Sequence, residues 1–100
     1  MDMQALMRQA QNMQRQMQKK QKEVEETEFI VSSNGGAITI NIMGDKKINK
    51  IEIDEDLLDD KDMLQDLLTV AMNEAIKKVD DEMNKVMNEA TGGMKIPGMF

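Results

Sequence analysis

The stretch that decides the fold is EFIVSSNGGAITINIMGDKKINKIEID, residues 28–54, in which three extended runs are separated by two turn signals. The middle run alternates cleanly and places Ile38, Ile40 and Ile42 on one face, as a half-buried strand requires. The segment Asn34-Gly35-Gly36 favours a tight turn, because Asn and Gly accept a positive φ. We therefore predict an antiparallel three-stranded meander with strands at about 28–33, 37–43 and 48–53.

The last of these strands has an irregular pattern. Ile51 and Ile53 alternate in phase, but Ile48 is out of phase with them. A shift of one residue moves a side chain to the other face of a sheet. The strand is therefore predicted either to begin late or to carry a β-bulge.

The segment before the strands, MQALMRQAQNMQRQMQKKQKEVEE (residues 3–26), contains no glycine, proline or aromatic residue. Its apolar side chains fall on alternating steps of three and four, which predicts a helix of about 36 Å with a coiled-coil seam over three heptads. Lys20 takes the seam position between Met17 and Val24. The apolar seam residues are Met3, Leu6, Ala10, Met13, Met17 and Val24.

After the strands, apolar residues again recur every three or four positions, which predicts a second helix at about 61–90, roughly 45 Å long. Asp59 or Asp60 is the expected N-cap, and Gly92-Gly93 is expected to end the helix before a short tail, 91–100. The chain is thus predicted to be a single α+β domain, 1–100, in the order α-β-β-β-α.

One amphipathic helix is enough to cover one face of a three-stranded sheet. The seam of the first helix and the far half of the second are then left to pack on each other, on a second copy of the chain, or on both. A homodimer is the simplest closure.

The residue inventory gives catalysis little support. The 100 residues include no cysteine and no histidine, so thiolate nucleophiles, imidazole bases and the commonest transition-metal ligands are missing. The acidic run at 54–62 lacks the glycine and glutamate that a calcium loop requires, which favours helix capping over cation binding. We expect a non-enzymatic protein without cofactor or metal. No apolar run reaches the length of a membrane span and no signal-peptide core is present, which favours the cytoplasm and no membrane partner.

Charge is distributed unevenly along the chain. The net charge is -6, yet residues 1–22 carry +4 and residues 23–100 carry -10. Arg8, Arg15 and Lys22 are spaced seven apart on the face opposite the seam, as phosphate-contacting residues would be. A solvated helix face accounts for the same pattern equally well. The candidate DNA-binding residues are Arg8, Arg15, Lys19, Lys20 and Lys22, with Lys77, Lys78 and Lys85 of the net acidic second helix as weaker candidates.

Three segments together resemble the YbaB/EbfC family of bacterial nucleoid-associated proteins. They are LMRQAQNMQRQMQKKQKEVEE, INKIEIDEDLLDDKDMLQDLLTVAMNEAIKKVDDEM and GGMKIPGMF, and they cover nearly the whole chain in the family's order. The resemblance implies an α-β-β-β-α fold, a tweezer-like homodimer, and binding of double-stranded DNA with low sequence specificity in the bacterial cytoplasm, at the nucleoid. It also implies DNA contact through the two long helices, an influence on nucleoid organisation and gene expression, and proteins of recombination and repair as possible partners.

A second interpretation comes from a different class of protein. A helix, a small sheet and a helix with Met-rich coiled-coil seams also describe a protein-interaction or chaperone-like scaffold, because thioether side chains repack easily around different clients. The state of the first helix's seam distinguishes the two. An exposed seam that binds hydrophobic peptides favours the scaffold, and a buried one favours the basic face.

Overall fold

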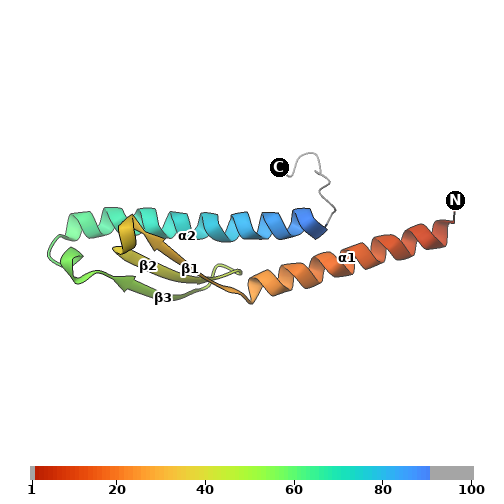
Figure 1. The fold of residues 1–100 in the computed structure, drawn as a ribbon, viewed down its shortest axis with the longest axis horizontal. Coiled ribbons are helices and arrows are strands. Elements are labelled where there is room, and N and C mark those ends of the chain that lie inside the picture. The colour runs from red at the N-terminus through yellow and green to blue at the C-terminus, as the bar shows by residue number, and fades with distance from the viewer. Residues whose placement is uncertain (1, 91–100) are drawn as a thin grey trace.

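The computed structural model describes residues 2–90 as two long helices and one sheet (Figure 1). Helix α2 lies across the sheet, and helix α1 leaves this body as an arm, so the molecule extends over 69 × 24 × 16 Å. The predicted α+β order is confirmed. The elements are α1 (Met3–Glu25), β1 (Glu28–Ser33), η1 (Asn34–Gly36), β2 (Ile38–Met43), β3 (Ile48–Ile53), η2 (Glu55–Leu57) and α2 (Lys61–Ala90).

Two predicted bounds differ from the structure by one residue each. Glu26 is the C-cap of α1 rather than part of it, although its N–H still donates to the carbonyl oxygen of Lys22. Ala37 has helical φ and ψ of -64° and -32° because it closes the short helix η1, so β2 begins at Ile38. The expected helix end at Gly92-Gly93 and the tail 91–100 lie outside the described residues.

The sheet is the predicted meander, with strand order β1-β2-β3 and both pairs antiparallel. The turn between β1 and β2 uses positive φ at Asn34, Gly35 and Gly36, as the sequence predicts. Between β2 and β3 the pairing steps from Asn41↔Lys50 to Ile42↔Ile48, which leaves Asn49 as an extra residue. This bulge returns Ile48 to the face that carries Ile42, which explains why Ile48 is out of phase with Ile51 and Ile53 in the sequence.

The core lies between the inner face of the sheet and α2. Ile38, Ile40 and Ile42 are completely buried and lie opposite a stripe of α2 that includes Ala71 and Ala75, which are also completely buried. Alanine at these positions lets the helix axis approach the sheet closely. Phe29 and Val31 of β1 share this face, because they pair with Ile42 and Ile40.

Helix α2 packs mainly on β1 and β2 and leaves the edge strand β3 less covered. Ile51 pairs with Ile40 and so belongs to the inner face, yet it is 41 % exposed. Met63, Val70 and Ile76 on α2 are also exposed apolar side chains. The described part of the chain therefore carries apolar surface on both the sheet edge and the helix.

The close approach of α2 to the sheet gives a direct test. Replacing Ala75 with leucine forces three extra carbons into a filled layer, and we expect a loss of about 1–3 kcal/mol in the free energy of unfolding. Urea denaturation followed by circular dichroism measures it. Asn84→Leu, at an exposed position of the same helix, is the matched control and should be near neutral. Equal effects in the two variants would contradict this account of the core.

Candidate nucleic-acid interface

Helix α1 is an exposed arm over most of its length. It begins at the cap Asp2, whose carboxylate oxygen Oδ1 accepts a hydrogen bond from the backbone N–H of Gln4 at 3.0 Å. Every residue from 2 to 16 is exposed, Met17 is half-buried, and only Val24 is buried. The arm is therefore anchored at its C-terminal end and free of tertiary contact at its N-terminal end (Figure 1).

The predicted basic stripe lies along this arm. Arg8, Arg15 and Lys22 are all exposed, and at 1.5 Å per residue they span roughly 21 Å. None of the three forms an ion pair with another residue in the range 2–90. Arg15 borders a shallow depression lined only by residues of α1, all of them glutamines apart from the arginine itself. Unpaired cations at regular spacing are suited to contact with a polyanion.

Lys19 and Lys20 occupy a different place. With Gln16 they line a cleft of about 370 Å³ whose other wall is Val86 and Glu89 of α2. This agrees with the seam position assigned to Lys20 from the heptad. Lys20 also lies 3.8 Å from Glu23, measured from Nζ to Oε2. These two lysines thus lie where the arm and α2 begin to separate.

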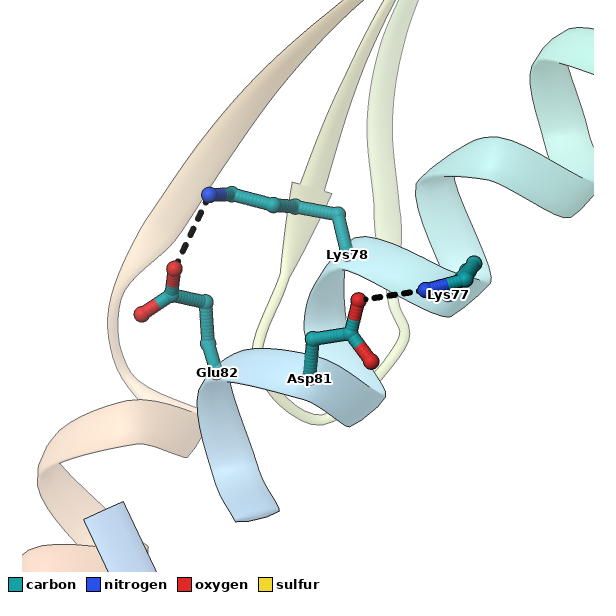
Figure 2. A network of polar contacts seen from close by, with 4 residues as sticks. All are labelled: Lys77, Lys78, Asp81 and Glu82. Atoms are coloured by element: carbon teal, nitrogen blue, oxygen red, sulfur yellow. Dashed lines mark hydrogen bonds and ion pairs between the residues drawn. The ribbon is translucent and has the colours of Figure 1, made fainter. Parts of the chain in front are cut away.

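The weaker candidates on α2 are mostly neutralised within their own helix. Figure 2 shows Lys77 reaching Asp81 and Lys78 reaching Glu82, with Nζ to carboxylate oxygen distances of 2.7 and 2.9 Å. Lys85 is exposed and contributes to the lowered pKa of Glu82. Local carboxylates therefore compete with phosphate for the lysines of α2, whereas within residues 2–90 no carboxylate forms an ion pair with the stripe on α1.

Both ion pairs are charged across the neutral range. The hydrogen bond and charge of Asp81 raise the pKa of Lys77 above 10.5, so Lys77 stays protonated until the pH rises through that higher value. The hydrogen bond and charge of Lys78 lower the pKa of Glu82 below 4.5, so Glu82 stays ionised until the pH falls through that lower value. Neither change occurs near pH 7.

The acidic run at the opposite end of the molecule caps helices, as the sequence predicts. Asp54 accepts a hydrogen bond from the N–H of Asp56 at 3.0 Å, and Asp60 accepts one from the N–H of Met63 at 3.1 Å. Asp60, rather than Asp59, is thus the capping residue of α2. Within residues 2–90, no three carboxylates are grouped so as to hold a metal ion. The same residues include no helix with the length and apolar character of a membrane span.

Sequence reasoning missed a polar cluster on the outer face of the sheet. The carboxylate of Glu28 accepts hydrogen bonds from Asn41 at 3.3 Å and from Asn49 at 2.8 Å. Asn49 is the bulge residue, so this cluster depends on the register shift between β2 and β3. The Lys-to-carboxylate pairs of α2, in contrast, have the i,i+4 spacing that predicts ion pairs directly from sequence.

The comparisons with known proteins point to one family. The model of the YbaB/EbfC DNA-binding family matches residues 1–94. A nucleoid-associated protein of Clostridium novyi is 49% identical over all of this chain and 90% of its own length, and one of Alkaliphilus metalliredigens is 44% identical over 99% of this chain and 89% of its own. The crystal structure of an uncharacterized protein from Helicobacter pylori has the same fold, with a TM-score of 0.75 and 24% identity over 92% of this chain and 99% of that one.

The ion pairs on α2 predict a gain of DNA affinity by mutation. In the double variant Asp81→Asn, Glu82→Gln, Lys77 and Lys78 lose their carboxylate partners and become available to phosphate. We expect tighter binding to a labelled duplex in fluorescence anisotropy, with a steeper salt dependence. Glu55→Gln with Asp59→Asn removes the same charge at the far end of the molecule and is the matched control. Equal affinity gains in the two variants would show that only net charge matters.

Proposed function

Because the chain belongs to the YbaB/EbfC DNA-binding family, we propose that it is a non-enzymatic protein that binds double-stranded DNA at the bacterial nucleoid as a homodimer. The observation that carries the DNA-binding part is the exposed, unpaired stripe of Arg8, Arg15 and Lys22 on the projecting arm. Nucleoid organisation and gene expression are the processes it would influence, with proteins of recombination and repair as candidate partners on the same DNA.

The chemistry of the arm favours the phosphate backbone over the bases. Successive stripe residues are roughly 10.5 Å apart along the helix, and each DNA strand carries one negative charge per roughly 3.4 Å of duplex axis, so each cation of the stripe can meet a phosphate. Phosphate contacts position a protein on DNA but carry no sequence information. The chain has two phenylalanines and no tyrosine or tryptophan, so base stacking has little support and a duplex is favoured over a single strand. Low sequence specificity follows.

The distribution of charge supports contact through the arm end. The acidic residues around η2 lie at the opposite end of a 69 Å molecule from the N-terminus of α1 (Figure 1). At physiological salt, the screening length of about 8 Å is far shorter than this separation. The acids around η2 therefore do not cancel the attraction of DNA to the N-terminal part of the arm.

A homodimer would cover the apolar surface that a single chain leaves exposed. The seam of α1 exposes Met3 by 72 %, Leu6 by 44 % and Met13 by 40 %. Ile51 at the sheet edge is 41 % exposed beside the core. A second copy presents surfaces of the same kind, so a two-fold contact is self-complementary. Two arms in one particle would double the number of phosphate-contacting cations.

The scaffold interpretation retains one favourable observation, the same exposed seam. Methionine side chains on the outer two-thirds of α1 form a soft apolar surface that suits client chains of varied sequence. Failure to bind a duplex at low salt, combined with binding of an apolar dye such as ANS by the assembled protein, would favour the scaffold. Saturable duplex binding without dye binding favours the DNA interface.

The first test of the proposal is a titration of a labelled random-sequence duplex by fluorescence anisotropy. We expect Arg15→Ala with Lys22→Ala to weaken binding and to lower the slope of log K against log salt by about 2 per chain, because each phosphate contact contributes about 0.9. Lys47→Ala with Lys61→Ala removes the same charge from the body and should leave the slope nearly unchanged. An unaltered slope in the α1 variant would contradict the site.

The homodimer has a separate test. Sedimentation equilibrium should give twice the chain mass of 11.4 kDa. Ile51→Lys, on the inner face of the sheet, should shift this equilibrium toward monomer, because a charge would be buried without a partner. Ile30→Lys is the matched control, since Ile30 is 66 % exposed on the outer face beside Asn41. A stable dimer in both variants would exclude the β3 edge from the interface.

A further inference from the structure

The turn between β2 and β3, residues 43–47, contacts both long helices. On one side, the backbone N–H of Gly44 donates to the carbonyl oxygen of Thr27, just beyond α1, at 3.0 Å. On the other side, Nζ of Lys46 lies 3.0 Å from Oδ1 of Asp80 on α2. The turn thus lies between the base of the arm and the helix that covers the sheet (Figure 1).

Gly44 is packed so tightly against α1 that no side chain fits. A Cβ atom at this position would lie 1.7 Å from the carbonyl oxygen of Val24 and 2.4 Å from its carbonyl carbon. Gly44 does not have a positive φ, so the turn itself does not require glycine here. The missing side chain therefore serves the contact between the turn and the last turn of α1.

The surface that Gly44 meets is itself fixed. The Val24 carbonyl oxygen already accepts a hydrogen bond from the N–H of Thr27 at 3.0 Å. The Thr27 hydroxyl donates to the carbonyl oxygen of Glu23 at 2.6 Å. The Val24 side chain is buried. The carbonyl group cannot rotate away from Gly44 without breaking these interactions, so the contact restrains the direction in which α1 leaves the body.

Lys46 completes the connection to α2 from a strained position. Its φ of 73° is in the left-handed region, which lysine rarely adopts. The turn is held in this shape by hydrogen bonds from the N–H of Lys46 to the Met43 carbonyl oxygen at 2.8 Å and from the N–H of Lys47 to Oδ1 of Asp45 at 2.9 Å. Asparagine or glycine would fit this φ more easily, but neither could reach Asp80.

We propose that the β2–β3 turn is a bracket that sets the angle between α1 and α2, with Gly44 as the positioning residue for the DNA-binding arm. A small displacement at the base is amplified, because α1 is roughly 34 Å long at 1.5 Å per residue. The structural part of the proposal concerns the chain alone. Its consequence for DNA rests on the proposed function.

The angle can be measured directly, because the chain has no native cysteine. Spin labels at Gln9→Cys on α1 and Asn73→Cys on α2 report the distance between arm and body by pulsed electron paramagnetic resonance. The labelled chain is diluted into unlabelled chain, so that only distances within one subunit contribute. In Gly44→Ala the clash with Val24 must be relieved. We expect this to move the base of α1 and to lengthen the mean distance by roughly 5–10 Å at the scale of this helix.

Gly35→Ala is the matched control. Gly35 has a φ of 68° in the other turn, and a Cβ there would meet nothing within 4 Å. This variant should be destabilised by its backbone conformation but should keep the distance of the parent protein. An unchanged distance in folded Gly44→Ala would overturn the bracket, and so would an equal shift in Gly35→Ala.

A second variant covers the case in which Gly44→Ala does not fold. Lys46→Asn suits the left-handed backbone and removes only the connection to Asp80. We expect its distance distribution to broaden while its melting temperature does not fall. An unchanged distribution would overturn the proposal.

Duplex titrations of the same variants test the consequence for DNA. We expect Gly44→Ala, but not Gly35→Ala, to lower the slope of log K against log salt by about 0.9 or more per chain, which corresponds to the loss of one phosphate contact. A shifted arm with an unaltered slope would overturn the positioning role of Gly44. If the parent protein does not bind the duplex at all, the proposed function fails, and the distance measurement still decides whether the bracket exists.

Discussion

The contact between the isoleucines of β2 and the alanine stripe of α2 is the constraint on which the rest of the structure depends. Ile38, Ile40 and Ile42 are completely buried, and Ala71 and Ala75 let the helix lie close above them. A three-stranded sheet offers only one such layer, and α2 occupies it over β1 and β2 and leaves β3 less covered. Helix α1 contacts α2 near its own C-terminal end, and most of it projects into solvent.

That projection separates opposite charges that would otherwise cancel. Net +4 is concentrated in residues 1–22, and the acids that cap η2 and α2 gather at the far end of the body. On a compact globule these charges would lie within a few screening lengths of each other. On a 69 Å molecule they do not, so a chain of net charge -6 presents a basic arm.

The sequence predicted the arrangement of the candidate residues within α1 and within α2 better than it predicted contacts between distant segments. Heptad spacing placed Arg8, Arg15 and Lys22 on one face, and the exposure of α1 agrees with it. The pairing of Lys77 with Asp81 also follows from i,i+4 spacing, which by itself disfavours that lysine as a phosphate contact. The connection from Lys46 to Asp80 spans distant segments, and no local pattern indicates it.

The sequence by itself determined the two long helices and the three strands, their order, their bounds to within one residue and the irregularity of the third strand. These features arise from local periodicity, turn residues and capping, which act over a few neighbours. The tertiary structure decided which strands α2 covers, how far α1 projects and how closely Gly44 approaches Val24. Such features depend on the relative placement of elements far apart in the chain. The segment GDKK, residues 44–47, indicates a turn in the sequence. Only the packing shows that Gly44 restrains the direction of α1, which ends at Glu25.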